Sequence, residues 1–485
     1  MALDTTAVRT SLTLLAAAVL GLALSPSPVA AQAEAERALP EVGPPGKQPI
    51  LRQISEAPQA ANLRSYVESM VGFHTRHTFS DTVSDTLGVG AARRWVHDQF
   101  EQISRDCGGC LETGFQRHMV PPQDRVPDST LVVNPYAIQR GTTNPERYYL
   151  ITGHLDSRVR DGMDSTSFAP GANDDASGVA GVIETARILS QYDFNASIIY
   201  MPVTGEEEGL HGSTQAARMY KEKGTYIAGV LSNDMIGNIQ GIDQVIENNV
   251  VRVFSEGTRA DETDRMASIR RYTGGENDSP SRNLARYIDQ IADDYVRNLD
   301  VMLIYRLDRF GRGGDHSAFN DVGYPAVRFT EAHEDYEHQH EDVGVRDGVK
   351  YGDTVDEVEF DFAEKVTGLN AATLASMAWA PRPPGGVEVD GAVSPSTTLS
   401  WDAIDPEKAP NLAGYKVYWR RTSAPRWQKS VFVGDTTEWT LENVVIDNHV
   451  FGVASVSERG FESPVVFPWP IGAYRPASFI EADDE

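Results

Sequence analysis

Apolar residues recur at helical spacing in several stretches of the chain. After Ala60, the residues Leu63, Val67 and Met70 repeat every three or four positions, as in an amphipathic helix with one buried face. The same spacing predicts helices over residues 91–103, 179–189, 282–295 and 360–377. Short apolar runs rich in β-branched and aromatic residues predict strands. These runs cover residues 131–138, 148–152, 197–203, 227–231, 301–305 and 326–329.

The order of these segments predicts the fold class. Strands that alternate with helices are typical of an α/β domain with a mostly parallel central sheet flanked by helices. The run over residues 197–203 is almost continuously apolar, as expected for a strand that is covered on both faces. In such sheets, ligands bind in the loops that follow the carboxyl ends of the strands.

The Pro- and Gly-rich segment 381–386 marks a domain boundary. Beyond it, evenly spaced strand-like runs predict a small all-β sandwich. These runs cover residues 397–401, 414–420, 438–441 and 450–456. Trp401 and the Tyr-Lys-Val-Tyr sequence at 415–418 resemble a fibronectin type III domain. We therefore expect a catalytic domain over 59–380, a fibronectin type III-like domain over 381–475 and an acidic tail over 476–485.

The N-terminus has the features of an export signal. The apolar run 12–24 follows Arg9 and is too short to span a bilayer comfortably. Small residues that suit cleavage follow at 29–31 and 31–33. We expect a signal peptide over 1–33, a linker or pro-segment over 34–58, and a secreted or periplasmic protein. The alternative is a membrane anchor that is not removed.

Charge and cysteine content narrow the class of protein further. The formal net charge of −27 argues against nucleic acid and anionic membrane surfaces as partners, since both would repel the chain. No later run is long enough to span a membrane, so we expect no stable membrane insertion once the signal is removed. The two cysteines, Cys107 and Cys110, are expected to form a small disulfide loop in an exported protein.

Acids and histidines gather in the loops after the predicted strands. His154 and Asp156 follow one apolar run, the pair Glu206 and Glu207 follows another, and Asp234 follows a third. Imidazole and carboxylate groups are the ligands that hold zinc. Asp156 is two residues from His154, so both side chains point to the same side of an extended segment and Asp156 can support His154. A catalytic role for Asp156 through His154 is expected.

A hydrolytic two-metal site needs a carboxylate that bridges the ions and another that remains free as a general base. The acids of the segment 173–175 lie in a tight turn before a predicted helix. Glu206 and Glu207 are adjacent, so their side chains diverge. One of them is therefore placed to bind metal while the other faces the substrate.

At this point the sequence resembles the co-catalytic zinc aminopeptidase family, whose relatives include glutamate carboxypeptidase II-like enzymes and glutaminyl cyclases. The resemblance covers roughly residues 60–377. Its motifs are Gly-His-Leu-Asp-Ser at 153–157, Pro-Gly-Ala-Asn-Asp-Asp-Ala-Ser-Gly at 170–178, Glu-Glu-Glu-Gly-Leu-His-Gly-Ser at 206–213, Asn-Asp-Met at 233–235, Gly-Asp-His-Ser at 314–317 and Gly-Tyr-Pro-Ala at 323–326.

The resemblance implies two zinc ions and a role for each site residue. The implied metal ligands are His154, Asp174, Glu207, Asp234 and a late histidine, with Asp174 as the bridge. Glu206 is implied to be the general base. The family places Asp-Thr soon after the last histidine, whereas here the pair 353–354 comes only after an insertion. His340 is preferred as that ligand over His338, and His333 comes third.

The resulting expectation is a secreted zinc exopeptidase that acts on peptides, with aminopeptidase activity preferred. A water held between the metals would attack the scissile carbonyl, and Glu206 would take its proton. The alternatives are a carboxypeptidase or dipeptidase of the same fold, an acyltransferase of the glutaminyl cyclase type, and a silent binding domain. Among the other residues, Asp175 is expected to cap a helix or support the ligands, and Glu208 is expected to be solvated.

The export signal leads to the first testable prediction. Protein recovered from the medium or periplasm should begin between Ala31 and Glu36, because the apolar run is short and small residues follow it. N-terminal sequencing measures this directly. Exported protein that still begins at Met1 would contradict the signal-peptide interpretation.

Overall fold

A computed structural model of the chain describes residues 47–481. The predicted signal peptide and its cleavage sites lie outside the described residues. Within the described range, none of the helices combines the length and the apolar character that crossing a membrane requires.

An eight-stranded sheet forms the centre of the fold, with strand order β1-β2-β4-β3-β5-β8-β6-β7. The neighbours β4, β3, β5 and β8 run parallel, whereas β1 and β2 are antiparallel additions at one edge. On the other side, β6 is antiparallel to β8 and parallel to β7. The strands are β1 (Leu111–Val120), β2 (Thr130–Gln139), β3 (Asn144–Thr152), β4 (Ala196–Tyr200), β5 (Tyr226–Asn233), β6 (Val250–Phe254), β7 (Asp300–Ile304) and β8 (Ala326–Glu331). The α/β fold class expected from the sequence is confirmed.

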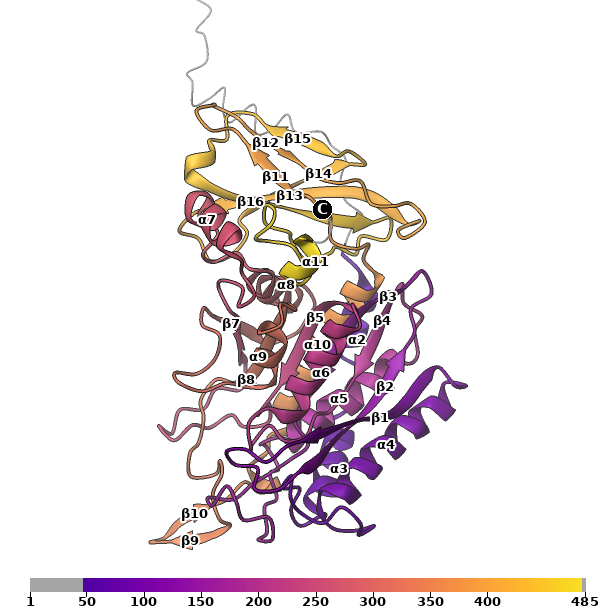
Figure 1. Ribbon diagram of the computed structural model, residues 1–485, viewed down its shortest axis with the longest axis vertical. Helices are drawn as coiled ribbons and strands as arrows, with labels where there is room; N and C mark the ends of the chain where they lie inside the picture. Colours follow the sequence, from indigo (N-terminus) through magenta and orange to yellow (C-terminus); the bar gives the residue numbers. More distant parts are fainter. Residues whose placement is uncertain (1–46, 482–485) are drawn as a thin grey trace, which may run out of the picture. The chain divides into compact units, whose positions relative to one another are not determined.

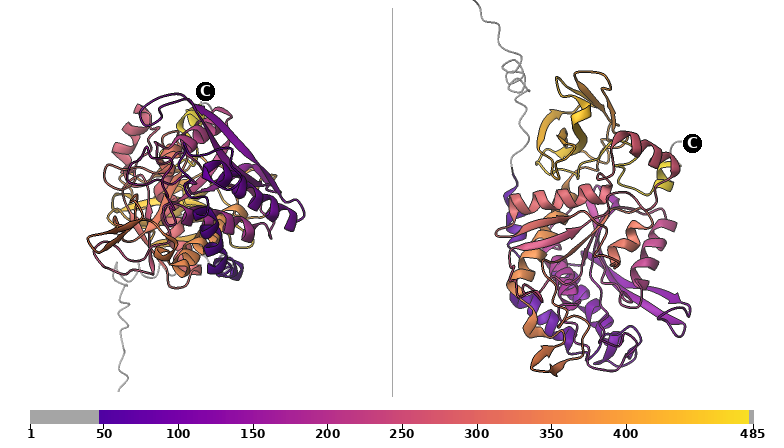
Figure 2. Two further views of the ribbon diagram at one scale, coloured as in Figure 1. Left: turned by 90° about the horizontal axis from the view of Figure 1, so that it is seen from below. Right: turned by 90° about the vertical axis from the view of Figure 1, so that its left-hand side faces the viewer.

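Helices cover both faces of this sheet (Figures 1 and 2). On β3, Tyr149 and Ile151 belong to the large core beneath the first group of helices, while Leu150 belongs to a second core on the opposite face. This alternation explains why the central strands are apolar at every position. The first group is α2 (Pro49–Ser55), α3 (Ala60–Val71), α4 (Gly88–Asp106), α5 (Ala176–Leu189), α8 (Pro280–Tyr295) and α10 (Phe360–Trp379); α6 (His211–Glu222) and α9 (Asp315–Asn320) lie on the second core.

Helices are also present in the two segments that flank the expected domains. The expected linker over 34–58 contains α2, whose Leu51 and Ile54 are 1% and 0% exposed in the main core. Pro at its first turn suits a helix start, because proline has no N–H to lose there. The expected acidic tail over 476–485 begins with α11 (Ala477–Glu481), and its Ala477 and Ile480 are buried. The described residues of both segments are therefore part of the packed fold.

Strands β1 and β6 were not expected from the sequence. Strand β1 carries polar residues at most positions, and only its first, sixth and last residues are buried, which hides the apolar pattern of a strand. It begins directly after the disulfide between Cys107 and Cys110, which is present as expected. The expected strand over 197–203 ends at Tyr200, although Met201 and Val203 still donate N–H groups to the carbonyls of Ile151 and Gly153, each at 3.0 Å.

The C-terminal segment forms two small antiparallel sheets, as the spacing of its strand-like runs predicts. One contains β11 (Glu388–Asp390), β12 (Thr397–Ser400) and β15 (Glu438–Leu441). The other contains β13 (Leu412–Arg421), β14 (Lys429–Gly434) and β16 (His449–Ser457). Trp401 and Tyr415 lie in the core between them. That this module is a fibronectin type III domain stays a prediction, as do the exact domain limits.

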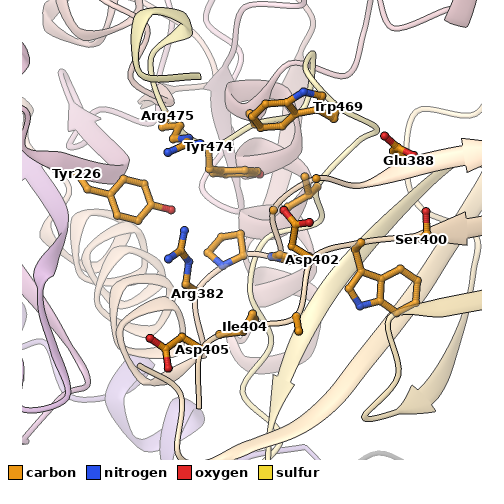
Figure 3. Close-up of a pocket in the computed structure, with 18 residues that line it drawn as sticks. Tyr226, Arg382, Glu388, Ser400, Asp402, Ile404, Asp405, Trp469, Tyr474 and Arg475 are labelled. Atoms are coloured by element: carbon orange, nitrogen blue, oxygen red, sulfur yellow. The ribbon is translucent and has the colours of Figure 1, made fainter. Parts of the chain in front are cut away.

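The linker segment 381–386 borders a cavity of about 780 Å³. Tyr226 and Arg382 point into it, and Tyr474 lies beside them (Figure 3). Tyr226 is the first residue of β5, whereas Asp234 follows the last residue of the same strand. This cavity therefore lies at the opposite end of the sheet from the predicted metal ligands.

Buried ion pairs join the C-terminal module to α8 and the loop before it. The Asp278 carboxylate accepts hydrogen bonds from Arg420 Nη2 at 2.7 Å and from Arg286 Nη1 at 2.9 Å. All three side chains are at most 3% exposed. Phe461, from the segment after β16, belongs to the main core of the α/β domain. The two parts therefore share a desolvated interface.

This interface leads to a stability prediction. Arg420→Met keeps most of the side-chain volume but removes one of the two charges that compensate Asp278. Breaking a buried ion pair costs roughly 3–5 kcal/mol, and we expect about 3 kcal/mol of unfolding free energy because Arg286 remains. Denaturant unfolding measures the loss. Lys408→Gln, which removes an exposed ion pair with Glu146, is the control and should cost less than about 0.5 kcal/mol. Equal stability of the two variants would contradict a structural role for the buried pair.

Candidate metal centre

Two loops at the carboxyl ends of β3 and β4 are tied together at the site. Leu155 N–H donates to the Val203 carbonyl at 2.7 Å, and His154 forms a bridge with Val203. The Asp156 carboxylate accepts the N–H groups of Gly205 at 2.7 Å and Glu207 at 3.0 Å. Gly205 has a φ of 85°, which glycine adopts without steric cost. This turn sets the position of Glu207 relative to His154.

His154 is held by the main chain rather than by the carboxylate expected from the sequence. Its Nδ1 lies 3.0 Å from the Asp156 carbonyl oxygen, whereas the nearest Asp156 carboxylate oxygen is 4.0 Å away. An Nδ1–H that donates to this carbonyl leaves Nε2 free to bind a metal. Asp156 therefore supports His154 through its backbone, and its carboxylate fixes the neighbouring loop.

The loop over 173–175 is fixed from both sides. Asp353 accepts the N–H groups of Asn173 and Asp174, each at 2.7 Å. Asp175 caps α5 and also accepts the N–H groups of His154 at 2.9 Å and Met235 at 3.1 Å. The expectation that Asp175 caps a helix and supports the ligands is confirmed. Asp174 is the remaining acid of this turn, and its carboxylate lies among the candidate metal ligands.

Five side chains converge in two groups that share Asp174. His154, Asp174 and Asp234 form one group, and Asp174, Glu207 and His340 form the other. Within each group the potential ligand atoms lie within 4.8 Å of one another. One Asp174 oxygen is 2.9 Å from His154 Nε2, and the other is 2.9 Å from His340 Nε2. This donor set of imidazoles and carboxylates fits zinc, and a carboxylate with one oxygen in each group fits a bridge.

Of the three late histidines, only His340 reaches the cluster in the described structure. Its Nε2 is also 2.8 Å from Glu207 Oε1. His338 instead lies 3.4 Å from Asp335, and His333 lies 3.3 Å from Asp243. The insertion that follows His340 is a hairpin of β9 (Gly344–Arg346) and β10 (Val349–Tyr351), after which Asp353 returns to the loop of Asp174.

The electrostatics of the cluster favour bound positive charge. Burial lowers the pKa of His340, but the charges of Glu207 and Asp174 outweigh this effect and raise the pKa to about 10. Burial also lowers the pKa of His154, but the hydrogen bond to Asp174 and the charges of Asp175, Glu206 and Asp174 together raise it well above the ordinary value. Carboxylates that hold a proton so firmly on two imidazoles would also attract a divalent cation to the same nitrogens.

Glu206 differs from its neighbour Glu207. It lines a pocket of about 450 Å³ beside the candidate metal ligands but is not in either metal group, and the residue is only partly exposed. Burial raises its pKa well above the ordinary value, and the charges of Glu207 and Asp234 add to this effect, although His154 opposes it. For Glu207, burial is outweighed by His340, so its pKa is lowered. The two adjacent acids therefore have different affinities for a proton.

Comparisons with known proteins identify the family of this chain. The profile of Peptidase family M28 matches residues 134–344. A probable zinc metalloprotease of Leptosphaeria maculans is 40% identical over 427 residues, which cover 88% of this chain and 98% of that protein. Another, from Pyricularia oryzae, is 40% identical over 414 residues, which cover 84% and 82% of the two chains. This chain belongs to peptidase family M28. The LapA aminopeptidase structure from Legionella pneumophila is 18% identical with a TM-score of 0.49, over 69% of this chain and 76% of that one.

This M28 protein is therefore a zinc metalloprotease by family, and its centre contains charged residues that sequence reasoning missed. Arg328, on β8 and 0% exposed, lies 3.0 Å from Asp234 and 3.2 Å from Asp308. Arg158 lies 3.1 Å from Glu207 and 2.7 Å from His340 Nδ1. The one signal for Arg328 was a charged residue inside an otherwise apolar strand. Such residues need a buried partner.

Glu208 corrects another expectation. It was expected to be solvated, but it is 2% exposed and lies 3.1 Å from His77 Nε2. Burial raises its pKa to about 8. In this M28 protein, Glu206 thus faces the pocket, Glu207 the candidate metal cluster and Glu208 the protein interior. The sequence alone, a run of three glutamates, does not distinguish these positions.

The histidines provide a matched test of the metal centre. His340→Ala should lower the zinc bound per chain, since it removes a nitrogen from one ligand group. His338→Ala should leave zinc content unchanged, because its ring contacts Asp335 instead. Zinc is measured by atomic absorption after dialysis of both purified variants. Zinc loss in the His338 variant alone would show that the wrong histidine is assigned.

Proposed function

We propose that this protein is a secreted exopeptidase that uses two zinc ions, with aminopeptidase activity. The observation that carries the proposal is the position of Asp174, one oxygen of which faces the buried His154 and the other the partly buried His340. Each histidine has a second acid nearby, Asp234 or Glu207. Such a pair of sites around one carboxylate is suited to metal-assisted hydrolysis.

Different residues of the chain have different roles in the proposed hydrolysis. Zinc, when bound, would polarise the scissile carbonyl and make water a better nucleophile at neutral pH. Glu206 accepts the proton of the attacking water and then gives it to the leaving amine. Its raised pKa suits a group that must both take and release a proton. Asp156 and Asp353 hold the loops that carry Glu207 and Asp174 in position.

Two other observations bear on the proposal. The adjacent Glu206 and Glu207 favour hydrolysis over acyl transfer of the glutaminyl cyclase type, because one acid binds metal while the other handles the proton. Carboxypeptidase and dipeptidase activities use the same chemistry and are distinguished by assay. The disulfide between Cys107 and Cys110 supports secretion, since such bonds persist in oxidising compartments.

Exchange of the two glutamates for glutamine tests the division of roles. Glu206→Gln should fold and keep two zinc ions per chain, and its turnover should fall by about 10²–10⁴-fold because the proton acceptor is lost. Glu207→Gln should bind less zinc, since an amide is a poorer ligand than a carboxylate. Turnover is measured on peptides with free and blocked ends, alongside zinc content.

The opposite pattern would be decisive. If Glu206→Gln lost metal while Glu207→Gln kept both ions and lost only turnover, the two roles would be exchanged. Wild-type enzyme that is fully active with one zinc ion per chain would contradict the bridging role of Asp174. Release of N-terminal residues from C-terminally blocked peptides supports an aminopeptidase, and cleavage only of peptides with a free C-terminus contradicts it.

A further inference from the structure

The pocket above the metal cluster is bordered by arginines. It has a volume of about 450 Å³ and is lined by Arg125, Arg158, Arg309 and Arg312 as well as by the cluster itself. These arginines come from three separate loops, before β2, after β3 and before α9. In a chain with a net charge of −27, four arginines around one pocket require an explanation.

Neighbouring acids do not neutralise this charge. Glu334 pairs with Arg252 at 2.8 Å, Arg309 at 3.3 Å and Arg312 at 3.3 Å. Asp308 pairs with Arg309 at 3.1 Å and with Arg328 at 3.2 Å. Burial raises the pKa of Glu334, but Arg309 and Arg252 outweigh it, so the pKa is lowered and Glu334 counts as one negative charge. Two carboxylates shared among four guanidinium groups leave this cluster positive.

The arginines differ in their availability to a substrate. Arg158 is engaged with Glu207 and His340, and the Arg309 side chain is only 10% exposed. The Arg312 side chain is 36% exposed, and its hydrogen bond within residues 47–481 is the long one to Glu334. Arg125 is exposed and forms no ion pair with another described residue. Arg312 and Arg125 therefore have donors to offer at the mouth of the pocket.

The acids on the pocket floor do not reverse this balance. Apart from Glu206, the acids that line the pocket are Asp174, Glu207 and Asp234, the proposed metal ligands. In the proposed zinc-loaded enzyme, the bound zinc ions would offset the negative charge of these three carboxylates. A guanidinium group binds a carboxylate through two parallel hydrogen bonds, and a cleft lined by one sign of charge attracts the opposite sign.

We propose that this pocket selects peptides that carry a carboxylate next to the scissile bond, with Arg312 and Arg125 as the specificity-determining residues. The inference rests on the proposed peptidase function and adds its substrate class. The carboxylate comes either from an acidic side chain or from the free C-terminus of a short peptide. Both present the same chemistry to the arginines.

A matched set of peptides tests the proposal on the zinc-loaded, full mature enzyme. The residue on either side of the scissile bond is Glu or its uncharged isostere Gln, and each peptide is made with a free and an amidated C-terminus. We expect kcat/KM to be about tenfold or more higher with a carboxylate, as for a charge-assisted hydrogen bond. If kcat/KM depends on whether the side chain is Glu or Gln, the pocket selects an acidic residue. If kcat/KM depends on whether the C-terminus is free or amidated, the pocket selects the terminal carboxylate.

Variants of the two arginines test which residues cause the preference for a carboxylate. Arg312→Gln and Arg125→Gln should bring the ratio of kcat/KM for acidic and amide substrates towards one, with zinc content unchanged. Arg64→Gln, on the exposed surface of α3, is the control and should keep the wild-type ratio. Equal rates for carboxylate and amide peptides, or an unchanged ratio in both pocket variants, would overturn the proposal while peptidase activity stands. If none of the peptides were cleaved, the proposed peptidase function itself would be contradicted.

Discussion

The position of the Asp174 carboxylate is the constraint on which the rest of the site depends. Both ligand groups need it, and its two oxygens face different histidines at the same distance of 2.9 Å. Its own backbone N–H is held by Asp353. A carboxylate that serves two groups tolerates little displacement, because a shift that improves one contact weakens the other. The surrounding loops are accordingly anchored by hydrogen bonds between charged side chains and backbone groups.

Much of this anchoring comes from buried charges outside the ligand set. Arg76, which is 0% exposed, donates to the carbonyls of Leu155 at 2.7 Å, Pro170 at 2.6 Å and Gly171 at 2.8 Å. It thus joins the loop of His154 to the loop of Asp174. A buried guanidinium with several carbonyl acceptors is costly to desolvate but well satisfied, so it favours one loop arrangement over others.

The sequence predicted which side chains meet at the candidate metal centre better than it predicted the residues that support them, for a physical reason. His154, Glu206, Glu207 and Asp234 follow apolar runs, and the carboxyl ends of parallel strands meet at one edge of a sheet. Arg328 has no comparable signal, because a charge inside a strand has meaning only once its partner across the sheet is known. His77 and Glu208 are far apart in the sequence, so local charge predicted a solvated glutamate where the fold forms a buried pair.

The shared core has a consequence for the order in which the protein folds. Helix α2, near the start of the described chain, packs on α10, and Phe461 closes the same core from beyond β16. Chains are synthesised from the N-terminus, and domains generally fold as units. The nascent α/β domain can gather its helices around the sheet, but a gap remains until residue 461 has been made. Completion of the α/β domain is therefore a late event in the synthesis of the chain, and it depends on a module of which no described residue belongs to the candidate metal groups.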